Sequence, residues 1–407
     1  MLARAASGED LDEQEITTLF RARGADFAAV CAAADAIRER LHGARVSYTV
    51  NRNINYTNVC YFHCNFCAFS KGKGHDDLRG TPYDIDDAEL ARRVAEAWER
   101  GATEVCLQGG IHPAYTGQKY LDVCRVVKAA APGMHIHAFS PLEIWQGAQT
   151  LGIPLAEFLL QLREAGLATL PGTAAEVLDD EIRAVIAPDK ISTEQWLEVM
   201  RTAHALGIRS TATLMFGHVE QPGHLARHLL RIKALAREHH GFTEFVPLPF
   251  VAEEAPLFRR GRARRGPTFR ESVLVHAVAR IVLHPEIPSV QASWVKLGPA
   301  GLRACLSAGA NDVGGTLMNE SITRAAGAAH GQEFPPAELE ALIRDAGREP
   351  WQRTTLYAPV DEERRRASLV AAPLDEIVNA PVRKRAAATT RASSCLPSPI
   401  WIFSAVA

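Results

Sequence analysis

The chain has 407 residues, of which 47% are hydrophobic and 23% charged, enough for one large barrel core or two ordinary domains. Its formal net charge of -2 provides no overall basic field for nucleic acid, and no apolar run is long enough to predict a membrane span. We recognise no signal peptide, so we expect a cytoplasmic protein whose thiols stay reduced.

The first part of the chain is predicted to be helical. Residues 9–43 carry apolar side chains at helical spacing, with Gly24 as a possible break, and we expect residues 1–45 to form an N-terminal cap. From Val46 the pattern alternates, which predicts a first strand that leads directly into a loop of cysteines.

That loop contains Cys60, Cys64 and Cys67 in the spacing C-x3-C-x2-C, so it offers three thiols to a metal. Iron-sulfur clusters that only move electrons are normally closed by four cysteines. A cluster held by three keeps one iron open, and an open position is typical of a metal that binds substrate. The alternatives are a zinc site, which His63 is poorly placed to complete beside Cys64, and three inert core cysteines. Eight cysteines in this chain are too sparse and uneven for a disulfide framework.

A repeated unit follows the cysteine loop, in which a helix ends at glycine and an apolar strand begins within three residues. The glycines are Gly101, Gly166 and Gly207, and helix-start patterns occur at Asp86 and Ser192. Alternating helices and buried strands predict a parallel α/β architecture, either an open doubly wound sheet or a barrel.

Polar residues follow these predicted strands, as expected where the carboxyl ends of barrel strands form one site. We therefore predict a partial parallel (β/α) barrel of the TIM type over residues 46–360. Any single histidine is more often structural than catalytic, so His137, His218 and Glu244 are candidates only. The strand-end residues are Gln108, Gly109, Gly110, His112, His135, His137, Glu176, His218, Glu244 and Lys296.

Two other segments have unusual composition. Five arginines lie close together beside glycine and proline: Arg259, Arg260, Arg262, Arg264 and Arg265. We interpret this segment as a solvated loop rather than as an RNA-binding site.

Residues 361–407 are charged and then of low complexity, so we expect a poorly ordered tail.

The cysteine spacing, with aromatic Phe66 before the last cysteine, resembles the radical S-adenosylmethionine (SAM) superfamily. Between about residues 46 and 357 the chain also resembles the tyrosine-using subunit of FO (deazaflavin) synthase, a 5-amino-6-(D-ribitylamino)uracil-L-tyrosine 4-hydroxyphenyl transferase. The segments that carry this resemblance are NRNINYTNVC, ATEVCLQGGI, HAFSPLEI, PGTAAE, FTEFVPLPF and GANDVGGTLM.

The resemblance implies a cytoplasmic enzyme with one 4Fe-4S cluster and SAM, which binds the open iron and is split to a 5'-deoxyadenosyl radical. It implies that the Cα–Cβ bond of L-tyrosine is cleaved and that the 4-hydroxybenzyl group is joined to 5-amino-6-(D-ribitylamino)uracil. A low-potential electron donor is implied as a partner. Because the chain has one cysteine motif, we expect a separate subunit to close the deazaflavin ring.

The resemblance also assigns roles to residues. Cys60, Cys64 and Cys67 match the cluster ligands, and Phe66 matches the aromatic residue beside the cluster and SAM. Gln108, Gly109 and Gly110 occupy the place of the loop that receives the SAM amine, although Ile111 stands where that loop usually has glutamate. Glu176 is the candidate for the ribose hydroxyls.

Two alternatives remain at this point. A related radical SAM enzyme of the futalosine menaquinone route shares the barrel and the cysteine spacing. A non-catalytic iron-sulfur carrier is a hypothesis from another class, but such a protein does not need a large pocket.

Overall fold

The computed structural model describes residues 1–71, 81–328, 330, 332–372 and 374. Its strands are β1 (Arg45–Thr49), β2 (Asn51–Ile54), β3 (Glu104–Leu107), β4 (His135–Ala138), β5 (Leu167–Leu170), β6 (Arg209–Phe216), β7 (Phe242–Pro249), β8 (Asp312–Gly315) and β9 (Glu349–Gln352).

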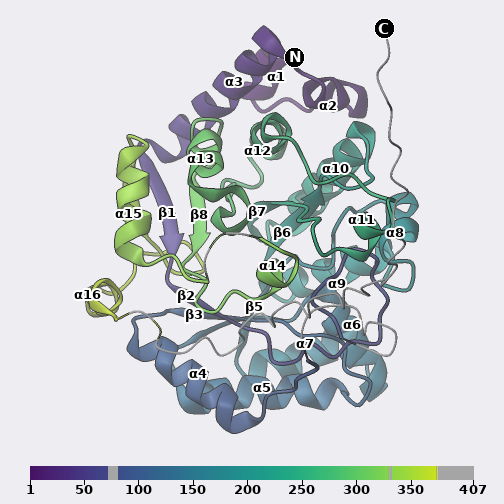
Figure 1. Cartoon of the computed structure of the whole chain (residues 1–407), viewed down its shortest axis with the longest axis vertical. Helices are drawn as coiled ribbons and strands as arrows, with labels where there is room; N and C mark the ends of the chain where they lie inside the picture. Colours follow the sequence, from purple (N-terminus) through teal and green to yellow (C-terminus); the bar gives the residue numbers. More distant parts are fainter. Residues whose placement is uncertain (72–80, 329, 331, 373, 375–407) are drawn as a thin grey trace, which may run out of the picture.

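Helices surround these strands (Figure 1). Among the described residues, no helix is both long and apolar enough to cross a membrane. The helices are α1 (Leu2–Ala6), α2 (Glu13–Phe20), α3 (Gly24–His42), α4 (Asp87–Glu99), α5 (Gly117–Ala130), α6 (Pro141–Leu151), α7 (Leu155–Glu164), α8 (Asp180–Ile186), α9 (Thr193–Ala205), α10 (Pro222–His239), α11 (Pro256–Arg259), α12 (Phe269–Leu283), α13 (Trp294–Leu306), α14 (Ile322–Ala325), α15 (Pro336–Asp345) and α16 (Glu362–Val370).

The strands form a curled, parallel partial barrel, which confirms the predicted fold class. Six of them pair in the order β2-β3-β4-β5-β6-β7, and three more pair as β8-β1-β9. All of these pairs are parallel. Isolated bridges join the two sheets, from Arg52 to Met318, from Phe245 to Val290 and from Gln291 to Asp312. The carboxyl ends of the strands therefore meet on one side of the molecule.

The predicted first strand is in fact two strands. β1 pairs with β8 and β9, whereas β2, only one residue later, pairs with β3. Val50 lies at the junction and is 1% exposed. An alternating pattern continues through such a junction, so it cannot show that the chain passes from one sheet to the other.

The helix-glycine-strand units are confirmed. Gly101, Gly166 and Gly207 have φ values of +78°, +111° and +76°, the left-handed conformation that glycine adopts without strain. The helix starts are confirmed as well, because the Asp86 side chain accepts from the Glu89 N–H and Ser192 forms a capping box with Gln195.

The ends of the described chain both pack on the barrel. α2 contacts α10 and α3 contacts α12, at the top of Figure 1. The predicted disorder from residue 361 is wrong for α16, because the Arg364 guanidinium lies 4.0 Å from the Trp98 ring centroid and donates to the Trp98 carbonyl. Residues 375–407 lie outside the described part, and the division into cap, barrel and tail stays a prediction.

Buried charges close the amino ends of the strands. Arg353 Nε lies 2.6 Å from Asp312 Oδ2, and its Nη2 lies 3.1 Å from Glu244 Oε2. The Thr355 hydroxyl donates to Glu104 Oε2 at 2.6 Å. These five side chains, which we call the barrel floor, are all buried. Their pairing satisfies carboxylates that would otherwise be costly to bury.

Candidate functional site

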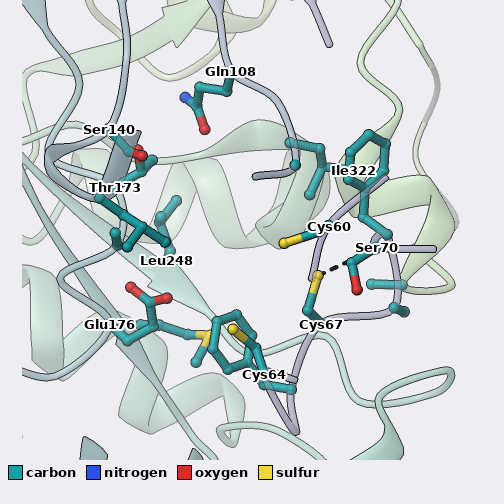
Figure 2. Close-up of a pocket in the computed structure, with 18 of the residues that line it drawn as sticks. Cys60, Cys64, Cys67, Ser70, Gln108, Ser140, Thr173, Glu176, Leu248 and Ile322 are labelled. Carbon is teal, nitrogen blue, oxygen red and sulfur yellow. Dashed lines mark hydrogen bonds between the residues drawn. The ribbon is translucent and has the colours of Figure 1, made fainter. Parts of the chain in front are cut away.

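A pocket lies at the carboxyl ends of the strands, opposite the barrel floor. Its lining comes from the loops after β2, β3, β4, β5 and β7, from the carboxyl-terminal parts of β6 and β7, from the start of α6, from the loop after α8, and from α13 and α14. Cys60, Cys64 and Cys67 form one wall of it, and Ser140, Thr173 and Leu248 lie across from them (Figure 2). The barrel therefore places the cysteine loop at the mouth where β/α barrels hold their chemistry.

The three thiols line the same pocket, and the loop that carries them is held at several points. The Cys60 N–H donates to the Lys71 carbonyl at 3.1 Å, and the Cys67 N–H donates to the Cys64 carbonyl at 3.1 Å. The Ser70 N–H donates to Cys67 Sγ at 3.4 Å. Burial raises the pKa of the Cys60 and Cys64 thiols, so a positive metal is needed to hold them as thiolates. Three sulfur atoms on one wall of a pocket fit an iron-sulfur cluster.

The glycines of the Gln108 loop allow a very close approach to the cysteine loop. A Cβ on Gly110 would lie 2.3 Å from the Val59 carbonyl oxygen and 2.9 Å from Cys60 Cβ. A Cβ on Gly109 would lie 2.4 Å from the Tyr56 ring. All three residues of the predicted segment, Gln108 to Gly110, line the pocket. Glycine is required here by space rather than by backbone conformation.

Glu143 lines the pocket as well, and it was not predicted. It is 1% exposed; its Oε1 accepts from the Gly109 N–H at 3.1 Å and from the Tyr56 hydroxyl. Its Oε2 accepts from the Ser140 N–H at 2.7 Å, and burial raises the pKa of this carboxyl. Glu143 thus supports the glycine loop from a neighbouring strand end. The capping box Ser140-x-x-Glu143 at the start of α6 is the pattern that could have located it.

Glu176 lies in the pocket as predicted, but with a cation beside it. Lys190 Nζ is 2.6 Å from Glu176 Oε1 and 5.6 Å from the centroid of the Phe66 ring, and both side chains are nearly buried. Burial disfavours the ammonium, but Glu176 and Cys64 outweigh it and raise the pKa of Lys190. Lys190 follows α8, far from any motif, and no pattern in the sequence pointed to it.

A second lysine in the pocket has no such partner. Lys296 lies in the first turn of α13, and burial lowers its pKa. Its Nζ donates to the Thr323 hydroxyl at 3.3 Å. In the part of the chain that the structure describes, Lys296 forms no ion pair. The pocket therefore contains one lysine neutralised by a carboxylate and one that is not.

The structure does not bring His137, His218 and Glu244 to the pocket lining. His137 Nδ1 is 2.8 Å from the Thr169 hydroxyl inside the barrel, and His218 is fully buried with its Nε2 3.1 Å from the Met215 carbonyl. Glu244 belongs to the barrel floor because β7 begins at Phe242, which puts it near the amino end of its strand. We therefore assign none of the three to catalysis.

Two family models match successive parts of this chain that do not overlap. The radical SAM superfamily model matches residues 54–232, and the model of the CofH/MqnC C-terminal region matches residues 239–365. The chain belongs to the radical SAM superfamily. A 4Fe-4S cluster and SAM are the cofactors that this membership implies.

Curated relatives place the chain within the FO synthase family. It is 46% identical to 5-amino-6-(D-ribitylamino)uracil--L-tyrosine 4-hydroxyphenyl transferase of Methanopyrus kandleri, over 81% of this chain and 89% of that relative. It is 48% identical to FO synthase of Streptomyces coelicolor and 49% identical to FO synthase of Nocardia farcinica, over 90% and 88% of this chain. The chain spans only about two-fifths of the length of these FO synthases, 42% and 41%.

Solved structures support the fold alone. Methylornithine synthase (PylB) superposes with a TM-score of 0.65 at 19% identity, over 86% of this chain and 96% of that one. The hydrogenase maturase HydG from Carboxydothermus hydrogenoformans gives a TM-score of 0.65 at 15% identity, over 88% and 79%.

Proposed function

We propose that this chain cleaves the Cα–Cβ bond of L-tyrosine and joins the 4-hydroxybenzyl group to 5-amino-6-(D-ribitylamino)uracil, a step toward deazaflavin. The observation that carries this proposal is the 46% identity to the Methanopyrus kandleri transferase over nearly all of that protein's length. The family model of the C-terminal region is shared by CofH and MqnC and does not separate them, whereas the curated relatives favour the FO branch.

The pocket residues suit the cofactors of the superfamily. Cys60, Cys64 and Cys67 would hold one 4Fe-4S cluster with an open iron, and Phe66 would lie beside it. When bound, cluster and SAM together supply a carbon radical able to take hydrogen from an unactivated position. The apolar side chains around the thiols exclude water from that position.

Other groups in the pocket would orient SAM. The carbonyls of the Gln108 loop can approach its amine because Gly109 and Gly110 carry no side chain, and Glu143 fixes the loop. Glu176 would accept hydrogen bonds from the ribose hydroxyls, with Lys190 holding the carboxylate in place.

Lys296 would bind the carboxylate of L-tyrosine. Burial disfavours the Lys296 ammonium, the charge of Glu320 offsets this effect only in part, and a bound carboxylate would stabilise the ammonium further. Of the two lysines in the pocket, Lys190 already has a carboxylate partner, so Lys296 is the one available to a substrate. Phe69, Leu248 and Phe250, which also line the pocket, would contact an aromatic ring.

The test is an anaerobic assay with the reconstituted protein, SAM, a reductant, tyrosine and the ribitylaminouracil. Glyoxylate, the hydrolysis product of the released glycine imine, should accumulate together with a coupled uracil product. If SAM is cleaved and neither product forms, the proposal fails and the enzyme of the menaquinone route becomes the better assignment. If the cluster is bound and SAM stays intact, the chain is an electron carrier.

Iron binding can be tested separately from turnover. Cys64→Ala should abolish uptake of about four irons per chain and all SAM cleavage, because two thiols cannot hold the cluster. The matched control is Cys305→Ala, since Cys305 is fully buried in α13 and does not line the pocket. Iron content after anaerobic reconstitution measures both. Loss of iron in both variants would mean a general folding defect.

The proposal also includes partners. A second radical SAM centre, in a separate subunit, would close the ring of the coupled product. A low-potential electron donor would start each reaction.

A further inference from the structure

Five exposed arginines lie at one corner of the barrel mouth, and no role described so far uses them. We call Arg259, Arg260, Arg262, Arg264 and Arg265 the arginine patch. It comprises the end of the short helix α11 and the loop that follows. The helix appears at the right of Figure 1.

The arginine patch is attached to the cysteine loop itself. The Leu257 N–H donates to the Asn65 carbonyl at 2.7 Å, and Arg260 Nη1 lies 3.4 Å from Asn65 Oδ1. Asn65 directly follows Cys64. Leu257, at 1% exposure, anchors α11 in the core. The patch therefore has a fixed position next to the cluster ligands rather than being a detached basic loop.

Part of the positive charge in the patch is not neutralised. Arg264 pairs with Glu220 at 3.5 Å and Glu271 at 2.9 Å, and Arg265 lies 3.7 Å from Glu253. Within the described residues, Arg259, Arg260 and Arg262 form no ion pair with a carboxylate. On a chain whose net charge is -2, three such arginines make a local positive surface.

The cysteine loop comes to the molecular surface next to this patch. Tyr61, which follows Cys60, is 40% exposed, and the His63 side chain, which precedes Cys64, is 68% exposed. A protein that docks on this face would come close to the cluster without entering the substrate pocket. Short-lived electron-transfer complexes use small interfaces, and opposite charges steer their formation.

We propose that the arginine patch is the docking site of a small acidic electron-carrier protein. The carrier loses one electron, which the cluster on Cys60, Cys64 and Cys67 accepts. This inference rests on the proposed function, which requires such an electron. Nucleic acid is the less favoured partner, because the patch lies against a metal-binding loop and the chain as a whole has no basic field.

The test reverses two arginines whose side chains form no hydrogen bond or ion pair in the described part of the chain, Arg259→Glu together with Arg262→Glu. The matched control is Arg209→Glu with Arg366→Glu, which makes the same change in net charge at exposed positions at the start of β6 and on α16. The probe is a reduced acidic ferredoxin. Two quantities are measured anaerobically on the reconstituted enzymes: the Kd of the complex and the rate of cluster reduction, followed by absorbance.

We expect the patch variant to raise the Kd and to slow reduction by ferredoxin at least about tenfold at low salt, with little change in the control. Reduction by dithionite should be the same in all three proteins. Salt should weaken ferredoxin binding to the unaltered enzyme and have little effect on the patch variant. An unchanged Kd in the patch variant, an equal loss in the control, or wild-type binding that ignores salt would each overturn the docking site.

The two proposals fail in different ways. Tyrosine cleavage driven by dithionite tests the transferase function and does not involve the patch. Ferredoxin affinity and cluster reduction test the patch and do not need tyrosine. A loss of iron in the patch variant would be detected by iron counting, and the salt dependence of the unaltered enzyme would then decide.

Discussion

Lys296 is a pocket residue whose positive charge has no ion-pair partner in the described structure. Burial lowers its pKa. Lys296→Met should raise the KM for tyrosine by about ten- to a hundredfold, because a hydrogen bond to a charged group usually contributes about 1.5–3 kcal/mol to binding. The KM for SAM should change little. Steady-state kinetics with each substrate varied in turn would measure both.

Lys296→Arg, which keeps the charge, should recover much of the loss. Tyramine, which lacks the carboxylate, should bind the unaltered enzyme and the Met variant almost equally. An equal rise in both KM values would show instead that Lys296 supports the pocket as a whole.

Glu143 provides a second prediction at this scale. Glu143→Gln places an amide where the Gly109 and Ser140 N–H groups both need an acceptor. We expect the free energy of unfolding to fall by about 1–3 kcal/mol, and SAM to bind more weakly because the glycine loop loses its support. Urea unfolding and SAM titration measure the two effects.

The exposed Glu164 on α7 gives the control for that prediction, since Glu164→Gln makes the same chemical change where no buried N–H depends on it. Equal stability of the Glu143 and Glu164 variants would contradict the supporting role.

Only part of the site could be predicted from single residues. The three cysteines were found because their spacing is local, and Glu176 because it follows a strand within a recognisable segment. Lys296 was among the polar residues expected at the strand ends, and it lines the pocket. Lys190 was missed because it follows α8, and nothing in the sequence marks its pairing with Glu176. Glu244 was misplaced since an apolar strand pattern does not show where the strand begins.

At the scale of elements, the close contact between the glycine loop and the cysteine loop sets the geometry of the site. In Gly110→Ala the new methyl group would lie 2.3 Å from the Val59 carbonyl oxygen, so one of the two loops must move. We expect the variant to stay folded but to bind iron incompletely and cleave SAM slowly. Iron content and circular dichroism together measure this.

Gly223→Ala is the matched control, because in α10 the nearest atom to an added Cβ is 3.6 Å away. A Gly110→Ala variant with full iron content would show that the loops adjust without cost.

Most elements of the fold could be predicted because their ends are marked. Glycine located the ends of α4, α7 and α9, and capping side chains located the starts of α4 and α9. The split of the first strand and the helix α16 were missed for a common reason. Both depend on which distant segment the chain packs against, and neither a strand junction nor the contact between Arg364 and Trp98 has a local pattern.

For the whole molecule, buried histidines make the free energy of unfolding depend on pH. Burial lowers the pKa of His228 to about 3 and the pKa values of His204 and His276 to about 4. In the unfolded chain these groups take up a proton near pH 6.5, whereas in the folded chain they stay neutral. Stability is therefore complete above about pH 6.5 and falls as the pH drops, by about 1.4 kcal/mol per pH unit for each histidine.

His228→Asn should reduce that dependence. The amide oxygen of the new side chain can replace Nδ1 of His228 as the acceptor of the Leu178 N–H, now at 2.9 Å, without a group that titrates. Urea unfolding at pH 7, 6 and 5 should show a smaller loss in the variant than in the unaltered protein. Parallel curves would mean that His228 is protonated to the same extent in both states.

The barrel floor bears on how such enzymes can be rearranged. Thr355 and Arg353 belong to the region matched by the C-terminal family model, while Glu104 belongs to the region matched by the radical SAM model. Recombining the first region with a foreign second region that lacks Thr355 would remove the hydroxyl that donates to the buried Glu104 Oε2, at a cost of about 1–3 kcal/mol for an unsatisfied buried group. The two halves of the sequence are thus not interchangeable modules, and natural or engineered hybrids must inherit these residues together.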